Sequence, residues 1–233
     1  AHPRAPPATD SNDAAGGDAQ RPSPPQDSVD GHFQTTGLKE YVSSLSHAVL
    51  GKRVTWEGKQ KPNILNMGWR RTWKLKEGTR NPKSRLFCKG FQDRRTGLNT
   101  YAGTPRLWAL LVILMHAVQS NHNLAFVDIS TAFLQATETT PERVAVRLPQ
   151  QLPTVPTLMP PWLTATMGPN DWTRIREMAA STMPGDVREL DKALYRLKNA
   201  PNLFVDHLRD VAKKNGYQTD EAEAVLLQTQ PCH

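Results

Sequence analysis

The sequence has few cysteines and no long hydrophobic run, and each absence excludes a class of protein. Its two cysteines, Cys88 and Cys232, are too few for a disulfide scaffold, and no Cys/His cluster has the spacing of a zinc site. The longest apolar run, 107–115, is well short of the ~20 residues that a transmembrane helix needs. The first ten residues lack the order of a secretory signal. These absences favour an intracellular protein of the cytoplasm or nucleus, with reduced thiols and no membrane partner.

Positive charge is concentrated in one segment. The chain carries 29 lysines and arginines against 22 acidic residues, a formal net charge of +7. Residues 31–100 hold 15 of the basic side chains against four acidic ones, whereas residues 1–30 and 101–233 are slightly acidic. A solvated basic face is one explanation for this segment. The other is a polyanionic partner such as nucleic acid.

The composition divides the chain into three parts. Residues 1–30 are rich in Pro, Ala, Asp, Gly and Ser and bury too little apolar surface to offset their ordering entropy, so a disordered tail or linker is predicted. The basic segment 31–103 follows. The last part, 104–233, mixes helical and strand patterns around a proline-rich inserted loop at about 150–186, in which one short helix is predicted at 172–180. The whole pattern indicates an α+β fold.

Apolar spacing predicts the elements of the basic segment and the start of the third part. A short amphipathic helix is predicted within 36–50. Extended runs at 72–76 and 85–91, joined by turn-forming residues 77–82, predict a basic β-hairpin. A helix over 104–123, with Thr104 as its N-cap, is apolar nearly all round and should be buried.

The remaining patterns predict shorter elements. A strand at 124–128 is followed by a helical turn at 130–135, and the alternation over 143–148 predicts another strand. Pro201 begins a helix that Gly216 ends, and a final strand is predicted at 224–228.

Asp128 is the candidate metal ligand. A carboxylate on the last residue of a buried strand is held rigidly at the end of a sheet. Mg²⁺ prefers such hard oxygen ligands and usually binds through one or two carboxylates and substrate phosphates. Capping of the turn that begins at Ser130 is the alternative role of the same side chain.

Three blocks in a fixed order resemble the reverse transcriptase of copia-type LTR retrotransposons: KSRLFCKGFQ (83–92), VDISTAFLQA (127–136) and LDKALYRLKNAP (190–201). The similarity covers about 36–228 outside the inserted loop. It implies the fingers and the first part of the palm of an RNA-directed DNA polymerase, which transfers nucleotides to a primer with two Mg²⁺ or Mn²⁺ ions. The implied partners are an RNA/DNA template-primer, dNTPs and the remainder of a polyprotein.

The resemblance also implies roles for individual residues. Asp128 would be the first catalytic carboxylate and would hold the metal together with the backbone carbonyl of Ile129. The nucleotide-binding residues would be Lys76 (or Lys74), Arg85, Thr131, Ala132 and Phe133, and the template-binding residues Lys89, Gln92, Tyr195 and Lys198. For the cations a solvated strand face is the alternative, and for Phe133 an ordinary place in the core.

The sequence departs from the family at several places, among them Asn199, where the family commonly has Gln, and Phe204-Val205, where it has an aromatic pair; two other departures matter most for function. Arg196 stands where the family usually has glycine, and a long side chain there would fill space that a close backbone approach needs. The family's second metal-binding element, two adjacent aspartates after an aromatic residue, has no counterpart in the sequence. We therefore expect no polymerase activity from this chain alone. A non-catalytic basic module that binds nucleic acid and a decayed retroelement remnant are the alternative interpretations.

Overall fold

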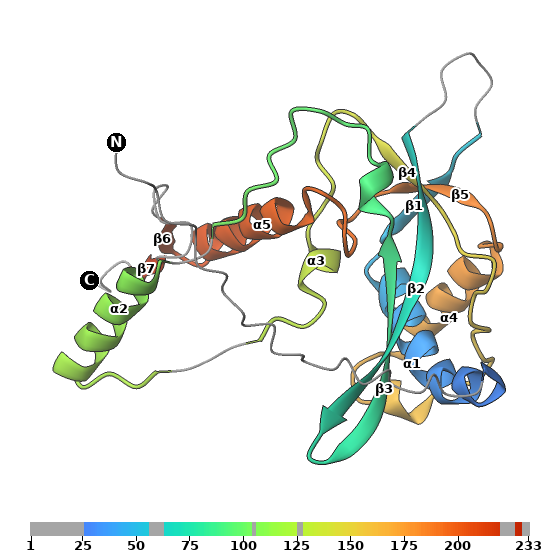
Figure 1. Ribbon diagram of the computed structural model, residues 1–233, viewed down its shortest axis with the longest axis horizontal. Helices are drawn as coiled ribbons and strands as arrows, with labels where there is room; N and C mark the ends of the chain where they lie inside the picture. Colours follow the sequence, from blue (N-terminus) through green and yellow to red (C-terminus); the bar gives the residue numbers. More distant parts are fainter. Residues whose placement is uncertain (1–25, 56–62, 104–105, 125–127, 220–226, 230–233) are drawn as a thin grey trace, which may run out of the picture.

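The computed structural model describes residues 26–55, 63–103, 106–124, 128–219 and 227–229 (Figure 1). Its helices are α1 (Gln26–Ser46), α2 (Leu107–Gln119), α3 (Ala132–Gln135), α4 (Pro169–Ala180) and α5 (Ala200–Lys214), with 3₁₀ turns η1 (Gly90–Gln92) and η2 (Pro161–Leu163). Its strands are β1 (Leu50–Arg53), β2 (Asn63–Lys76), β3 (Thr79–Cys88), β4 (Val144–Arg147), β5 (Val187–Leu190), β6 (Tyr217–Thr219) and β7 (Leu227–Thr229). The predicted α+β class is confirmed.

A mixed five-stranded sheet organises the fold, with the strand order β1-β5-β4-β2-β3. Strands β2 and β4 are parallel, and the other neighbouring pairs are antiparallel. The first four residues of the long strand β2 pair with β4, and the rest of it pairs with β3. Beyond the sheet, β2 and β3 therefore continue as a two-stranded hairpin (Figure 1).

This hairpin is the one predicted from the sequence, but it is longer and its turn is tighter. The turn residues Glu77 and Gly78 have φ angles of 50° and 75°. Two consecutive positive φ angles are typical of the type I′ turn that closes a two-residue hairpin loop. The turn predicted over 77–82 is thus wrong for 79–82, which pair with 73–76. Pro82 is tolerated within β3 because β3 is an edge strand.

Helix α1 covers one face of the sheet with apolar side chains. Tyr41, Val42 and Leu45 are buried together with Leu65 and Leu86 of the hairpin strands. The amphipathic helix predicted within 36–50 is confirmed, although α1 begins at Gln26. The disordered tail predicted over 1–30 is wrong for residues 26–30, and the rest of that tail lies outside the described residues.

The proline-rich segment predicted as an inserted loop contributes to the core. Helix α4 confirms the short helix predicted at 172–180 and begins at Pro169. Its Trp172 and Ile175 are buried, as is Leu163 of η2. The Trp172 indole N–H also donates a hydrogen bond of 3.3 Å to the Thr157 carbonyl. Much of this segment is therefore a packed part of the fold rather than a surface loop.

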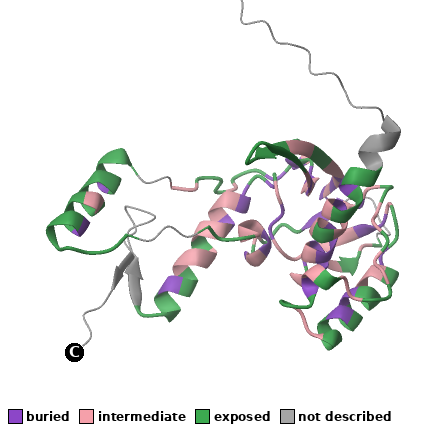
Figure 2. Cartoon of the chain, turned by 90° about the horizontal axis from the view of Figure 1, so that it is seen from below, coloured by how far each residue is buried: buried purple, intermediate pink, exposed green. Residues whose placement is uncertain are grey.

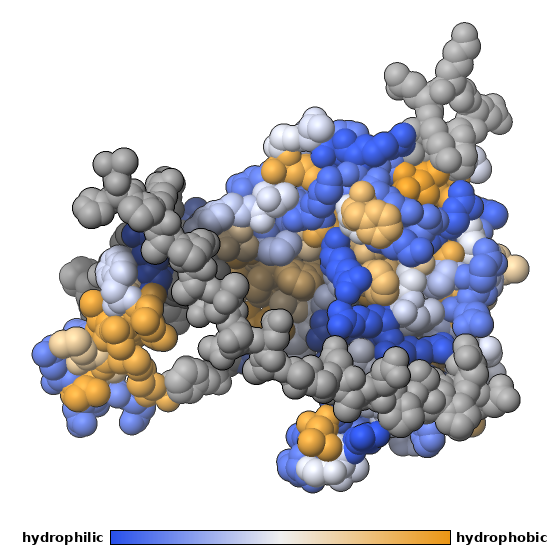
Figure 3. Space-filling model, viewed as in Figure 1, coloured by the Kyte–Doolittle hydropathy of each residue, from blue (hydrophilic) through white to orange (hydrophobic). Residues whose placement is uncertain are grey.

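The apolar helix predicted over 104–123 is present as α2, but the prediction that it is buried is wrong. Of its 13 residues only Ala109 and Ala117 are buried. Figure 2 shows α2 as mostly exposed, and Figure 3 shows its apolar side chains gathered on the surface. An all-round apolar pattern predicts that a helix needs partners, but it does not identify them. The predicted cap, Thr104, lies outside the described residues.

Most of the remaining predicted elements are confirmed. Strand β4 matches 143–148, α3 matches the helical turn at 130–135, and α5 is followed by Gly216, whose φ of 81° suits a helix end. The strand predicted at 124–128 falls mainly outside the described residues, and its two ends, Leu124 and Asp128, are exposed and not part of a strand. Strand β7 overlaps the strand predicted at 224–228.

Candidate nucleic-acid interface

The β2–β3 hairpin carries five of its seven cations on one side, which we call the basic face; Arg71 and Arg80 lie on the other side. Residues directly opposite each other in the register share a face, and the face alternates with every residue along a strand. The pairs Arg70–Arg85, Thr72–Lys83, Lys74–Asn81 and Lys76–Thr79 therefore share the basic face. It holds five cations and no acidic side chain of either strand. The opposite face holds the core residues Leu65, Met67, Leu86 and Cys88.

The cations of the basic face repel one another. Arg70 and Arg85 are direct cross-strand neighbours, and like charges in such pairs are destabilising. Burial, with Arg85 and Lys74 as further causes, lowers the pKa of Lys83, while Glu40 and Asp128 act in the opposite direction. A bound anion would relieve this repulsion.

A groove of about 540 Å³, which we call the lysine groove, lies between α1 and the hairpin. Four lysines and a single carboxylate are among the described residues that line it: Lys39, Lys74, Lys76, Lys83 and Glu40. Burial raises the pKa of Glu40, although the Leu86 N–H and the charges of Arg85 and Lys83 partly offset this effect. The hydroxyl-bearing Thr131 also lines the groove, so this lining brings together two of the predicted nucleotide-binding residues, Lys76 and Thr131.

Arg85 packs against Tyr195, the first of three aromatic rings that contact each other edge to face. Its guanidinium lies 4.8 Å from the ring centre of Tyr195, within the range of a cation–π contact. Tyr195 in turn makes an edge-to-face contact with Phe133 at 5.7 Å, and Phe133 makes another with Phe204 of α5 at 6.2 Å. The structure thus joins three predicted site residues, Arg85, Phe133 and Tyr195. Phe133 packs among aromatic rings, as its alternative role in the core requires.

Lys83 lies on the basic face and lines the lysine groove, although it was not among the residues predicted from the sequence. Arg85 pairs with Arg70, which lies six residues from Lys76 in β2. At the rise of a β-strand, Lys76 and Arg85 are therefore roughly 20 Å apart along the hairpin. Lys83 is two residues from Arg85 on the same face and interacts with it electrostatically. The period-two alternation of Lys83 and Arg85 in β3 was the signal that could have identified it.

Asp128 does not form a metal site with other described residues. Both Asp128 and Ile129 are exposed, and no group of three His, Cys, Asp or Glu side chains able to hold a metal occurs in the part of the chain that the structure describes. One exposed carboxylate does not fit the two Mg²⁺ ions that the resemblance implies. We therefore derive no catalytic step through a metal.

Thr131 and Ala132 lie at the start of α3, beside the end of α1. Thr131 has a φ of 52°, a strained value for a β-branched residue. Its hydroxyl donates to the Ser130 carbonyl at 2.7 Å and lies 3.3 Å from Nε2 of His47. Ala132 begins a helix of only four residues. The strain at Thr131 marks this corner as one that the surrounding contacts hold in place.

The predicted template residues Lys89, Gln92 and Lys198 lie at the other end of the hairpin. The Asn66 N–H donates a hydrogen bond of 2.8 Å to the Gln92 side-chain oxygen. The Lys89 N–H donates one of the same length to the Asn66 carbonyl. The Lys198 ammonium donates to the Asp93 carbonyl at 2.6 Å. Gln92 and Lys198 therefore make structural contacts within the fold.

A buried ionic network, which we call the Arg95 network, ties this end of the hairpin to α5. The side chains of Arg95, Asp93 and Glu138 are fully buried; Arg95 lies 2.9 Å from Asp93 and 3.4 Å from Glu138. Arg95 also donates to Asn199, whose side-chain amide donates to Glu138. Burial raises the pKa of Asp93, but hydrogen bonds from Arg95 and Asn63 outweigh it and hold the pKa below its usual value.

Arg196, the departure from glycine, occupies a left-handed backbone conformation with a φ of 70°. Glycine adopts this conformation without strain, which gives the position a local reason to favour it. The close backbone approach occurs at Gly90, where a Cβ would collide with the Arg196 carbonyl oxygen. The Arg196 guanidinium turns onto Phe87, 4.6 Å from its ring centre. Because Phe87 shares a face with Arg85, Arg196 adds a cation to the basic face.

Comparison with protein-family models, with curated proteins and with solved structures yields no match for this chain. Among the described residues, no helix is both long and apolar enough to cross a membrane.

Proposed function

We propose that this chain binds nucleic acid through the basic face, as the fingers and partial palm of a copia-type reverse transcriptase would bind an RNA/DNA template-primer. The observation that carries the proposal is the placement of five hairpin cations on one face without a carboxylate, opposite a face that is anchored in the core. Phosphate groups are the natural ligands of such a surface, because lysine and arginine neutralise them and release counterions.

The Arg85–Tyr195 contact supports the same proposal. A guanidinium forks to phosphate oxygens and can stack on a flat ring, and Tyr195 restricts the orientations that Arg85 adopts. The lysine groove next to it offers further cations and the Thr131 hydroxyl. Together they form a surface that offers a sugar–phosphate backbone one arginine held against a ring and several lysines.

The test is a binding titration with a fluorescent template-primer at several salt concentrations. We compare the wild type with Lys74→Gln/Lys83→Gln/Arg85→Gln, a variant of the basic face. The matched control, Arg174→Gln/Lys213→Gln/Lys214→Gln, removes the same charge from exposed residues of α4 and α5. Each phosphate contact contributes about 0.9 to the slope of log K against log salt, so the first variant should lose up to about 2.7.

The control variant should keep the wild-type slope within about 0.5. Equal losses in both variants would show that only net charge matters, and they would overturn the assignment to the basic face. A primer-extension assay with Mg²⁺ is expected to give no product, since the sequence lacks the adjacent aspartate pair. Robust synthesis would contradict that expectation.

A non-catalytic module that binds nucleic acid is the second candidate function. The observation that favours it is that the described residues contain no group of three or more His, Cys, Asp or Glu side chains able to hold a metal around Asp128. The two candidates differ in one measurement: a non-catalytic module binds template-primer equally well with and without dNTPs, whereas a polymerase fragment gains affinity when the complementary dNTP is present.

A further inference from the structure

Lys83 differs from the other lysines that line the lysine groove in how far it is buried. Lys39, Lys74 and Lys76 are exposed, whereas Lys83 is half-buried. Its strand, β3, pairs with β2 along its whole length, so the backbone that carries Lys83 is held in place. Lys83 therefore lines a groove of about 540 Å³ from a fixed position.

The surroundings of Lys83 favour its neutral amine. Arg85 is two residues away in β3, and Lys74 is a diagonal neighbour across the hairpin. The carboxylates of Glu40 and Asp128 act in the opposite direction, but burial and the two cations outweigh them, so the pKa of Lys83 lies below that of an ordinary lysine. More of Lys83 is therefore unprotonated at neutral pH than of an exposed lysine, and only the unprotonated amine is a nucleophile.

The same groove attracts anions to this amine. Among the described residues, no acidic side chain forms an ion pair with Lys74, Lys76 or Lys83. Of the described residues that line the groove, four are lysines and only Glu40 is acidic. A cleft lined mainly by one sign of charge raises the local concentration of small ions of the other sign.

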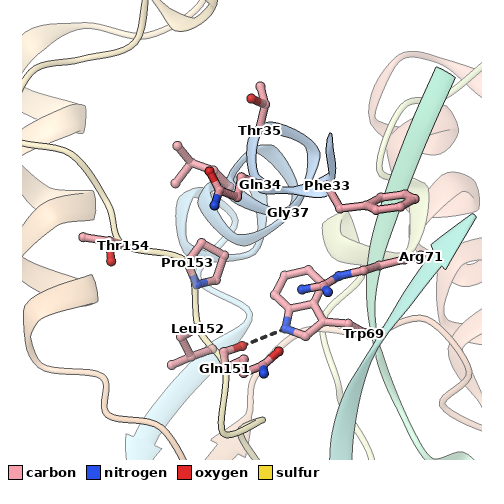
Figure 4. Close-up of a pocket in the computed structure, with 11 residues that line it drawn as sticks. Phe33, Gln34, Thr35, Gly37, Trp69, Arg71, Gln151, Leu152, Pro153 and Thr154 are labelled. Atoms are coloured by element: carbon pink, nitrogen blue, oxygen red, sulfur yellow. Dashed lines mark hydrogen bonds between the residues drawn. The ribbon is translucent and has the colours of Figure 1, made fainter. Parts of the chain in front are cut away.

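A second groove, between α1, β2 and the segment 151–154, has a different lining (Figure 4). Its volume is similar, about 560 Å³, but the described residues that line it include no lysine. The Trp69 indole N–H donates a hydrogen bond of 2.8 Å to the Gln151 carbonyl there, which Figure 4 marks with a dashed line. Of these two grooves, only the lysine groove combines a nucleophilic amine with a cluster of ammonium groups.

We propose that the lysine groove is an acylation site in which acyl phosphates modify Lys83. The lining ammonium groups hold the phosphate of the donor, and the Lys83 nitrogen attacks the adjacent carbonyl carbon. An N–C bond forms, and the C–O bond to the phosphate breaks. The phosphate leaves with the bonding electrons and takes up the proton that the amine loses, so the products are an amide and inorganic phosphate.

Acylation changes the charge of the surface around the groove. The amide is uncharged, so the reaction removes one of the five cations of the basic face. The inference itself rests on the lining of the groove and not on the proposed binding of nucleic acid.

The test incubates the full chain with acetyl phosphate at neutral pH and follows the acetylation of each lysine by mass spectrometry. Lys213 and Lys214 are the reference, because they are exposed residues of α5 that do not line the groove. An uncharged donor, p-nitrophenyl acetate, separates the reactivity of the amine from the attraction of the groove for phosphate. Lys74→Gln removes the diagonal cation, and Lys214→Gln is its matched control. Circular dichroism checks that both variants are folded.

We expect acetyl phosphate to acetylate Lys83 at least about tenfold faster than Lys213 and Lys214, the lower end of the enrichment that a charged cleft produces. The preference should be smaller with p-nitrophenyl acetate, and pyrophosphate should suppress only the reaction with acetyl phosphate. Lys74→Gln should slow this reaction at Lys83 about threefold, the effect of one charge at roughly 7–8 Å in water. Lys214→Gln should leave the rate at Lys83 unchanged.

Three results would overturn the inference. The first is acetylation of Lys83 no faster than that of Lys213 and Lys214. The second is an equal preference for Lys83 with both donors, which would show that the groove does not recruit the phosphate. The third is an equal effect of Lys74→Gln and Lys214→Gln, which would indicate a general charge effect. None of these measurements involves nucleic acid, so failure here is distinguishable from failure of the proposed function.

Discussion

Replacement of Arg95 by methionine should destabilise the fold by about 3–5 kcal/mol, the usual effect of removing one partner from a buried ion pair. The Arg95 side chain is fully buried between Asp93 and Glu138. It also donates hydrogen bonds to Thr140 at 2.6 Å and to Asn199 at 3.3 Å. Methionine replaces the aliphatic part of the arginine side chain but not its guanidinium, so it leaves two buried carboxylates without their cation. Urea unfolding followed by circular dichroism measures the difference in the free energy of unfolding.

The pH dependence of this difference identifies its cause. In the wild type the lowered pKa of Asp93 stabilises the fold above the usual carboxyl value of 3.8, and this contribution is lost as the pH falls through the lower folded value. In Arg95→Met the burial of Asp93 is no longer outweighed, so its pKa rises and protonation relieves the unpaired charge. The destabilisation should therefore shrink between pH 7 and pH 4.

The adjacent exposed residue provides the control, since Arg94→Met should change the free energy of unfolding by no more than about 0.5 kcal/mol. A destabilisation by Arg95→Met of less than about 1 kcal/mol at pH 7, or one that grows as the pH falls, would refute the view that Arg95 balances two buried carboxylates.

Two further substitutions test the lysine groove and the backbone beside the basic face. Glu40→Gln removes the one carboxylate among the described residues that line the lysine groove, and it keeps an acceptor for the Leu86 N–H. The affinity for pyrophosphate should therefore rise about threefold to tenfold in calorimetric titration; an unchanged affinity would contradict the groove's role. Arg196→Gly should be more stable than Arg196→Ala by about 0.5–1 kcal/mol in urea unfolding, because both lose the Phe87 contact but only glycine is unstrained at a φ of 70°. The reverse order would show that the strain is relieved elsewhere.

Local patterns in the sequence were sufficient to predict the hairpin, α4 and α5. Each depends on residues close together in the chain: alternation in β2 and β3, proline at the start of a helix, and Gly216 after its end. The basic face also follows from such a pattern, because a period of two separates cations from apolar residues. Lys83 could have been selected by the same reasoning.

The Arg95 network could not be predicted in this way. It joins Asp93, Glu138 and Asn199, which come from three distant parts of the chain, and no local period relates them. The exposure of α2 had a similar reason, since its composition indicated the need for apolar partners without showing where they lie. Long-range contacts, rather than the choice between helix and strand, were the part that sequence reasoning lacked.

The two faces of the hairpin explain how this chain can hold mutually repelling cations in place. Arg70 and Arg85 are cross-strand neighbours, which costs stability, yet the backbone that carries them cannot move apart. Leu86, the neighbour of Arg85 in β3, is buried beneath α1, and the Leu86 N–H is bonded to Glu40. The burial of one face therefore keeps the charges of the other at a fixed spacing before any ligand arrives. A polyanion that binds this face relieves the repulsion, and this relief adds to the binding free energy. Because the strands are already held in place, little conformational entropy is lost on binding.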